Sequence, residues 1–364
     1  MLRGQVQGSI PPVLFLRGGI AIITQLPVAL LLFFASLFIV MGAAAWFTRR
    51  LEALCELFGL SIGILSLLSA IGANIPNYAA SIDAIVTSHA DVGIGIIVGS
   101  SIYNIAIILG LCALASYETS GITLNAQEAQ DARGIGWYAL AITLGIQAVI
   151  ALLPTTPSIV KSWETGPAHI LTLLANLIVL GIFAWLIVHI LRRSHPGPAS
   201  PLATHSQAHL SRSPSIHIFR LSAEVVLALG IALLGVVVMV QSGEVVSADL
   251  HLPSVFTGLV ILAVATSLPN TVVAVSLART NEAAASVEEI FSSNSINLAL
   301  GIALPLLFWQ GLLSDRSILF LDMPLTILLT LGMLFGVLKR HFGRVPGLVL
   351  LCIYVVWVIA HLWI

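Results

Sequence analysis

The chain has 364 residues, of which 58% are hydrophobic and only 9% are charged, and its mean hydropathy is +1.06. A water-soluble domain carries roughly 25% charged residues, so the composition excludes a soluble globular protein and predicts an integral membrane protein. The 15 basic and 16 acidic residues nearly cancel. This balance excludes a nucleic-acid-binding protein, which needs a concentrated positive surface.

Apolar stretches long enough to cross a bilayer recur along the chain. A spanning helix takes about 20 residues, and the pattern predicts an all-α polytopic membrane protein with about ten transmembrane helices. Residues 1–26 form either an interfacial lead-in or part of a processed signal, and the lack of a small-residue cleavage site favours the lead-in. The predicted helices are residues 27–47, 59–87, 92–115, 136–153, 169–191, 221–241, 255–278, 284–309, 323–338 and 345–364.

Basic residues are distributed unevenly between the two sides that these spans would create. One side holds 4 Lys and Arg residues and the other holds 11. Short cytoplasmic loops are enriched in Lys and Arg, so the richer side is predicted to be cytoplasmic. Both termini are then outside the cytoplasm, as in a multi-pass protein of a bacterial-type inner membrane.

The longest connection, residues 193–220, separates a first half at 27–192 from a second half at 221–364. It is rich in Ser and Pro and is predicted to be a flexible cytoplasmic linker. A metal site is not predicted there, although the segment contains His195, His205, His209 and His217. Three cysteines, Cys55, Cys112 and Cys352, lie far apart in apolar sequence and are predicted to be small buried hydrophobic residues.

The two halves contain the same polar pattern. The segment AIGANIPNYAASIDA begins at Ala70 and AVATSLPNTVVAVSL begins at Ala263, which is a shift of 193 residues. Each copy is predicted to be a helix broken at its proline, followed by a second polar helix. The shift superposes Pro76 on Pro269, Asn77 on Asn270, Ser100 on Ser293 and Asn104 on Asn297.

The two copies are predicted to insert with opposite orientations, because an odd number of helices, five, separates them. Inverted repeats with interrupted helices are the architecture of secondary transporters, whose substrate site lies near the bilayer midplane between the repeats. Pro and Asn also act as kinks and as interhelical glue in membrane helices. Glue explains one such site, but it explains poorly two matched sets at identical spacing.

On these motifs the chain resembles the calcium/cation antiporter superfamily, and within it the prokaryotic type of sodium/calcium exchanger. The family repeats read approximately G-[TS]-S-x-P-E and, downstream, G-N-x-x-G-S-N-x-x-[ND]. Here they read GANIPN at 72–77 with GIIVGSSIYN at 95–104, and ATSLPN at 265–270 with EEIFSSNSIN at 288–297. The resemblance covers nearly the whole chain. It implies two inverted five-helix repeats and secondary active cation antiport by alternating access, with no enzymatic activity and no cofactor.

The family places an ion-coordinating glutamate after each motif proline, whereas this chain has Asn77 and Asn270 there. Asn104 and Asn297 hold the downstream positions, the second of which is often aspartate in the family. The resemblance therefore implies a divergent member with a central quartet of neutral amides. Calcium affinity follows the number of carboxylates among the ligands, so this quartet is predicted to hold Ca²⁺ weakly. Three alternatives stay open for it: it holds Na⁺ better, it holds a polar solute, or it holds nothing.

Further polar residues lie one helical turn from the quartet. Glu289 lies about 80° around the helix from Asn297, so a site role is predicted for it rather than for Glu288, which points the opposite way. Alternatively, both glutamates lie at the cytoplasmic mouth of a helix that begins later. Asp83 is predicted to be an exposed helix-end charge, and Asp91 is predicted to cap the helix at 92–115. The candidate ligands beside the quartet are Asn74, Ser100, Thr266, Ser267, Ser293 and Glu289, with Ser81, Ser101 and Asn294 nearby.

Three functional hypotheses follow. The leading one is a secondary cation antiporter of the calcium/cation exchanger type, driven by an ion gradient. The second is a divergent exchanger with an altered substrate, either a monovalent cation or a proton carried by Glu289. The third is a transport-inactive homologue that acts as a structural or regulatory membrane protein, as loss of both glutamates would predict. The sequence contains no ATP-binding loop or nucleophile motif, which disfavours a pump or an enzyme. The predicted partners are the lipid bilayer and calcium, sodium or protons.

Overall fold

The computed structural model describes residues 26–57, 70–87, 89–164, 166–193, 214–279, 283–309 and 312–363. Nine helices within these residues are long and apolar enough to cross a membrane. They confirm the prediction of an all-α polytopic membrane protein. The predicted span 59–87 is described only from residue 70, and residues 1–25 and most of the predicted linker lie outside the described residues.

The first half contains the spans that carry one copy of the repeat. The π-helix η1 interrupts the span Ala90–Ala115 near its centre. In a π-helix each backbone hydrogen bond spans five residues along the chain, one more than in an α-helix. The elements in order are α1 (Leu26–Leu57), α3 (Ile75–Val86), α4 (Ala90–Tyr103), η1 (Asn104–Leu109), α5 (Gly110–Ala115), β1 (Gly121–Thr123), α6 (Ala126–Ala151), α7 (Pro157–Glu164) and α8 (Pro167–Arg193).

The second half begins with α9, which starts at Pro214 and so takes up the end of the predicted linker. Proline suits the first turn of a helix, where its missing N–H costs no hydrogen bond. The elements are α9 (Pro214–Asp249), α10 (Ser254–Phe256), η4 (Thr257–Leu262), α11 (Ala263–Ala278), α12 (Ala283–Leu298), η5 (Ala299–Ala303), η6 (Pro305–Leu307), η7 (Ile318–Asp322), α13 (Met323–Lys339), β2 (His341–Gly343) and α14 (Arg344–His361).

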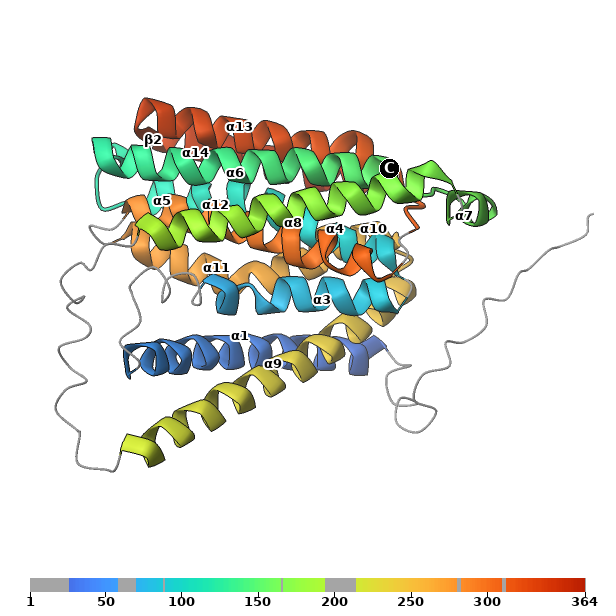
Figure 1. Ribbon diagram of the computed structural model, residues 1–364, viewed down its shortest axis with the longest axis horizontal. Coiled ribbons are helices and arrows are strands. Elements are labelled where there is room, and N and C mark those ends of the chain that lie inside the picture. Colours follow the sequence, from blue (N-terminus) through green and yellow to red (C-terminus); the bar gives the residue numbers. More distant parts are fainter. Residues whose placement is uncertain are drawn as a thin grey trace, which may run out of the picture.

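The helices are arranged around α4, α11 and α12. Helix α1 packs chiefly against α9, and the two lie at one edge of the molecule, with α13 and α14 at the opposite edge (Figure 1). The span Ala90–Ala115 is 94% buried, whereas Arg344–His361 is only 22% buried. The polar repeat helices are therefore inside the bundle, and the apolar outer helices separate them from lipid.

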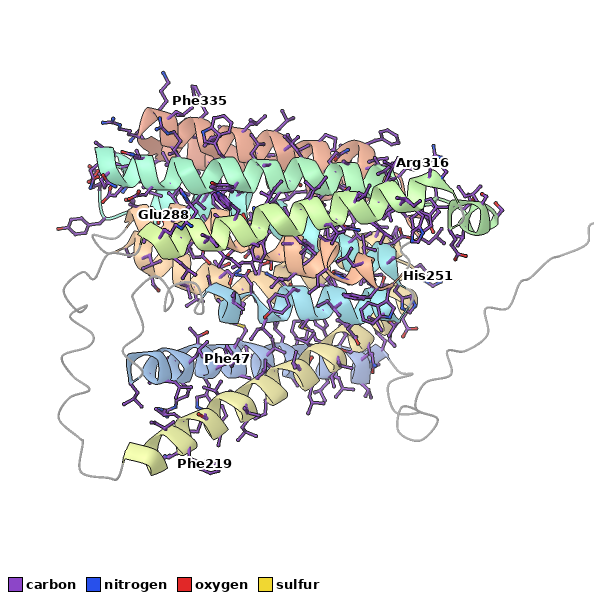
Figure 2. All side chains as sticks on the ribbon, in the orientation of Figure 1. Phe47, Phe219, His251, Glu288, Arg316 and Phe335 are labelled. Atoms are coloured by element: carbon purple, nitrogen blue, oxygen red, sulfur yellow. The ribbon has the colours of Figure 1, made fainter. Side chains whose placement is uncertain are left out.

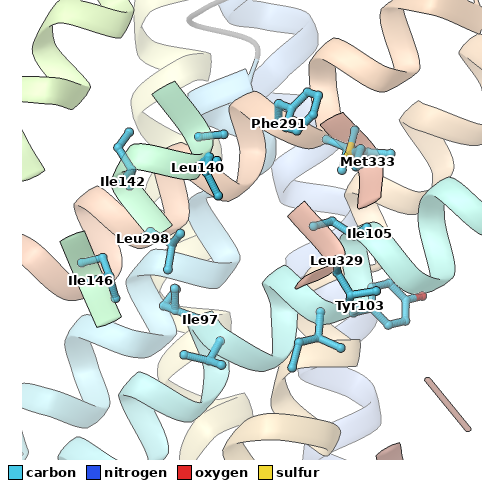
Figure 3. Close-up of a cluster of buried hydrophobic side chains, with 14 of the residues drawn as sticks. Ile97, Tyr103, Ile105, Leu140, Ile142, Ile146, Phe291, Leu298, Leu329 and Met333 are labelled. Carbon is cyan, nitrogen blue, oxygen red and sulfur yellow. The ribbon is translucent and has the colours of Figure 1, made fainter. Parts of the chain in front are cut away.

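The hydrophobic core joins the two halves. Ile97, Tyr103 and Ile105 from α4 and η1 pack in one cluster with residues of α6, α12 and α13 (Figure 3). Phe291 of α12 is fully buried among them. Helices of both halves thus share one core, and neither half encloses a core of its own around the repeats.

Helix α4 crosses η4 so closely that there is no room for a side chain at two glycines of the crossing, Gly99 and Gly258. A Cβ atom added at Gly99 would lie 2.0 Å from the carbonyl oxygen of Leu259, and one added at Gly258 would lie 2.4 Å from that of Val92. Small residues allow membrane helices to approach at backbone distance. The crossing sets the spacing of the two repeats.

The ends of the described chain lie at one end of the bundle. The start of α1 and the C-terminus lie there, while the end of α8 and the start of α9 lie at the other end (Figure 1). At that second end β1 pairs antiparallel with β2, with Ile122 opposite Phe342. This arrangement agrees with an even number of crossings between the termini, and the side that faces the cytoplasm stays a prediction.

Two predictions about isolated residues need correction or fall outside the described part. Cys112 is buried as predicted, but Cys352 is exposed on the outer face of α14, because α14 is mostly turned outward. The side chain of Cys55 lies outside the described residues, and so do the predicted linker histidines His195, His205 and His209 and the side chain of His217.

Replacing Gly99 by alanine should destabilise the protein, because the new methyl group would meet a backbone oxygen. We expect a loss of about 1–3 kcal/mol, the usual range for overpacking, measured as a lower thermal-unfolding midpoint in detergent. Gly181→Ala in α8 is the control, since a Cβ there meets no atom within 4 Å. Equal stability of the two variants would contradict the close crossing.

Reporter fusions should place both termini outside. We expect alkaline phosphatase, which is active only outside the cytoplasm, to be active when fused after Ile364 and inactive when inserted within 194–213. The reason is the bias of basic residues toward the linker side. Activity in the linker alone would reverse the assigned orientation.

Candidate functional site

The predicted site residues gather where α3, α4, α11 and α12 meet. Asn77, Asn104, Asn270 and Asn297 are each fully buried. Three of them lie near the middle of described spans, namely Asn104 within Ala90–Ala115, Asn270 within Thr257–Ala278 and Asn297 within Ala284–Leu307. A buried amide in such a place needs hydrogen-bond partners, since an unpaired polar group is costly there.

The helix before α3 breaks at Asn74. Residues 70–73 are helical, Asn74 lies in a turn, and α3 restarts at Ile75 with a proline in its first turn. Pro76 cannot donate a backbone hydrogen bond, which ends the preceding helix. The backbone carbonyl of Asn74 then accepts from the amides of Asn77 and Tyr78 at 3.0 and 3.3 Å.

The second copy does not break in this way. Helix α11 continues through Pro269, so the predicted break is wrong for this copy. Membrane helices tolerate proline where local changes of winding and neighbouring groups satisfy the freed carbonyls. Helix α11 therefore keeps its helical course on both sides of Pro269.

The side chain of Asn74 joins the two halves. Its Oδ1 accepts hydrogen bonds from Nδ2 of Asn77 at 3.3 Å and from Nδ2 of Asn270 at 2.7 Å. Its own Nδ2 donates to the Ala70 carbonyl at 2.8 Å and to Ser293 Oγ at 2.9 Å. Every lone pair and hydrogen of this amide is therefore used within the protein.

A second series of bonds crosses between α4 and α11. Ser267 Oγ donates to Asn77 Oδ1 at 3.4 Å, and Ser100 Oγ lies 2.8 Å from Ser267 Oγ. Asn297 Nδ2 donates to Ser100 Oγ at 3.4 Å. Since the single hydroxyl proton of Ser267 points to Asn77, Ser100 donates to Ser267, and the donors run in one direction from Asn297 to Asn77.

The inverted repeat is visible in these contacts. The 193-residue shift converts the Asn74–Ser293 bond into the Ser267–Ser100 bond, and the Asn74–Asn270 bond into the Ser267–Asn77 bond. Two matched pairs of contacts thus cross the interface between the repeats. Their correspondence agrees with the predicted two-fold relation.

Asn104 is joined to the second half through Asn294. Its Nδ2 donates to Asn294 Oδ1 at 2.8 Å, and Asn294 Nδ2 donates to the Ser101 carbonyl at 3.2 Å. The sequence motif predicted Asn294 only as a neighbour of the site. Its contact with Asn104 spans 190 residues, and the motif contains no sign of that pairing.

Several side-chain oxygens in the site lack a partner. Asn104 Oδ1, Asn270 Oδ1 and Asn297 Oδ1 are buried and accept no hydrogen bond from any described residue. The amide nitrogen of each of these side chains is engaged, as set out above. Each of these amide nitrogens makes one hydrogen bond, whereas each oxygen makes none. Unpartnered carbonyl oxygens are ligands that a cation accepts.

Glu289 is the carboxylate attached to the network. Ser293 Oγ donates to Glu289 Oε1 at 2.7 Å, while Glu289 Oε2 is buried without a partner among the described residues. Helix α12 begins at Ala283, so Glu289 lies in its second turn. Figure 2 places the neighbouring Glu288 toward the end of the bundle opposite His251 and Arg316.

Other predicted residues lie apart from the network. The hydroxyl of Thr266 donates to Leu262 of its own helix, and that of Ser101 donates to Ile97. Ser81 donates to the carbonyls of Gly93 and Gly301. The hydroxyls of Thr266 and these serines therefore stabilise helix packing, and within the described part of the chain none of them donates to the free oxygens. The Ser101 backbone carbonyl is the part of these residues that contacts the network, through Asn294.

Two acidic residues differ from their predicted roles. Asp83 is half-buried in the last turn of α3 and not exposed. Asp91 is not the cap of α4, because His89 holds that position. Its carboxylate instead accepts from the backbone amide of Ser314 at 2.9 Å, so it ties α4 to a loop of the second half. Across the described residues, no three His, Cys, Asp or Glu side chains are grouped closely enough to hold a metal ion.

Comparison with solved structures identifies the same fold elsewhere. The sodium-calcium exchanger NCX_Mj superposes with a TM-score of 0.60 and 17% identity, over 91% of this chain and 98% of that chain. The chain and NCX_Mj therefore share this helical fold.

Sequence comparison extends this likeness. Inner membrane protein YrbG of Escherichia coli (strain K12) is 25% identical over 320 residues, which cover 85% of this chain and 90% of that protein. Sodium/potassium/calcium exchanger 4 of Mus musculus is 35% identical over 79 residues, only 21% of this chain and 13% of the exchanger. The family model described as sodium/calcium exchanger protein matches residues 28–192 and 222–363. With both halves matched, the chain belongs to the sodium/calcium exchanger family, a family of membrane transporters.

Proposed function

We propose that the chain is a secondary active cation antiporter whose ion binds between the two repeats and is exposed to the two sides of the membrane in turn. The observation that carries the proposal is the set of free oxygens on Asn104, Asn270 and Asn297. Each unpaired buried polar atom costs about 1–3 kcal/mol, and here three such oxygens belong to residues of the two matched motifs. A bound cation supplies the missing partner.

The family relation supports cation exchange as the reaction. NCX_Mj is named as a sodium-calcium exchanger and the mouse relative as a sodium/potassium/calcium exchanger. Inverted repeats enclosing a polar site suit alternating access, in which one repeat moves against the other around the site. The concentration gradient of one cation then drives the transport of another cation in the opposite direction.

The charge of the site favours the altered-substrate hypothesis over calcium exchange. Glu289 is the carboxylate that hydrogen-bonds to the network within the described part of the chain, and the quartet itself is neutral. One negative charge offsets a monovalent cation such as Na⁺, but leaves a divalent ion half compensated in a medium where uncompensated charge is expensive. We therefore propose Na⁺ or another monovalent cation as the preferred substrate, with proton transport through Glu289 as the other form of this hypothesis.

Counterflow in proteoliposomes tests the proposal. Uptake of labelled Na⁺ should be faster into vesicles preloaded with unlabelled Na⁺ than into vesicles without Na⁺. The reason is that the binding site of an antiporter returns to the other side of the membrane only with an ion bound. Ca²⁺, K⁺ and protons are then added singly as competitors. Competition by K⁺ or protons, with weak competition by Ca²⁺, fits the monovalent site. Absence of flux for every cation would establish the transport-inactive hypothesis instead.

Glu289→Gln should weaken Na⁺ binding, because the substitution removes the charge and keeps the shape. We expect the KM for Na⁺ in counterflow to rise about tenfold or more, corresponding to about 1.4 kcal/mol. Glu288→Gln makes the same chemical change one residue away and should leave the KM unchanged. Equal effects of the two substitutions would remove Glu289 from the site.

The double change Asn77→Glu and Asn270→Glu should increase competition by Ca²⁺, because two carboxylates in a low-dielectric site offset a divalent charge. Counterflow of Na⁺ in the presence of graded Ca²⁺ measures the effect. The double change to Gln, which adds the same length without charge, is the matched control. If the Glu variant folds and its calcium response equals that of the Gln variant, the quartet is not the ion site.

A further inference from the structure

An asparagine side chain has two chemically opposite ends. Its carbonyl oxygen accepts hydrogen bonds and its NH₂ group donates them. The composition of a site lined by four neutral asparagines therefore does not decide the charge of its ligand, since such a site can offer oxygens to a cation or N–H groups to an anion. The orientation of each amide decides which of the two it receives.

Asn74 holds the nitrogen ends of two quartet members. Nδ2 of Asn77 and Nδ2 of Asn270 both donate to its Oδ1. The orientation of Asn74 is itself determined, because its Nδ2 faces two acceptors, the Ala70 carbonyl and Ser293 Oγ. Rotating Asn74 by half a turn would place oxygen against oxygen at Ala70.

Asn294 holds a third member in the same manner. Nδ2 of Asn104 donates to Asn294 Oδ1 at 2.8 Å. The orientation of Asn294 is determined in turn by the Ser101 carbonyl, to which its Nδ2 donates at 3.2 Å. Both asparagines are buried, with Asn74 at 0% and Asn294 at 4% exposure, so water does not compete for these bonds.

These contacts change the predicted role of Asn74. A carbonyl oxygen has two lone pairs, and both of those on Asn74 Oδ1 are occupied by N–H groups of the protein. The oxygen has none left for an ion. Asn74 therefore belongs to the framework that orients the ligands, whereas Asn104 and Asn270 have free oxygens.

We propose that Asn74 and Asn294 are positioning residues that make this neutral site selective for cations, by binding the amide nitrogens of Asn270 and Asn104 and leaving the oxygens of these two amides without a partner. The inference rests on the proposed function. It names what sets the polarity of the same site. Without these two residues the amide groups of Asn270 and Asn104 lose the hydrogen bonds that hold them and are free to rotate and to present N–H.

Leucine substitutions test this role, since leucine has nearly the shape of asparagine and cannot accept a hydrogen bond. We expect Asn74→Leu and Asn294→Leu to raise the KM for Na⁺ in counterflow by about tenfold or more. They should also make counterflow sensitive to nitrate, exchanged for gluconate at constant Na⁺, because an anion is attracted to inward N–H groups. Asn176→Leu is the control. Asn176 is another fully buried asparagine, on α8, with no hydrogen-bond partner among the described residues.

Asn294→Asp separates orientation from packing. Aspartate loses the bond to Ser101 but keeps an acceptor for Asn104, so the KM for Na⁺ should stay at or below that of the parent and nitrate should have no effect. Should the leucine variants fail to fold, this variant decides: a KM raised tenfold overturns the proposal, and a KM retained or lowered supports it.

The outcomes distinguish the two proposals. If the parent protein shows Na⁺ counterflow, and the leucine variants keep the parental KM and do not respond to nitrate, the positioning role alone is overturned. A parent without flux of any cation overturns the proposed function, and the positioning role with it.

Discussion

The hydrogen bond from Ser293 to Glu289 is the first of a series of bonds that reaches two amides of the quartet. Ser293 Oγ donates to Glu289 Oε1. The Ser293 oxygen is then free to accept from Asn74 Nδ2, and the Asn74 oxygen accepts from the two quartet amides. Reversing any one member would set two oxygens or two donors against each other. One carboxylate of α12 is thus linked through Ser293 and Asn74 to two quartet amides, and the Ala70 carbonyl fixes the same orientation of Asn74 independently.

The two repeats are equivalent in shape and unequal in charge. The position that the 193-residue shift assigns to Glu289 in the first half is Ile96, which is fully buried. The backbone crossing at Gly99 keeps the halves at matched distances, yet the carboxylate stands on one side only. The carboxylate that contacts the network therefore lies on the α12 side alone, even though two pairs of hydrogen bonds between the repeats are related by the shift.

Composition and repeat pattern were sufficient to predict the spans, the inverted arrangement and the gathering of Asn74, Asn77, Asn270 and Asn297, because long apolar runs and matched motifs are local signals. The course of α11 through Pro269 was not predictable, since a proline in a membrane helix can either break the helix or be accommodated by it. Nor were the partner of Asn294 and the saturation of Asn74. Which end of an amide faces which neighbour is decided by contacts between residues about 190–220 positions apart, and a motif of six to ten letters does not contain those neighbours.

The length of chain between these partners has a consequence for biogenesis. Asn74 finds its acceptor Ser293 at a separation of 219 residues, and synthesis proceeds from the N-terminal half. The first half therefore enters the bilayer before the acceptor has been translated. During that interval Asn74 and Asn104 face a medium in which unpaired amides are unfavourable, and they depend on temporary partners such as water or the insertion machinery. The last polar contacts close only after α12 arrives, which makes assembly of the two halves, and not insertion of any one helix, the step at which the site comes into existence.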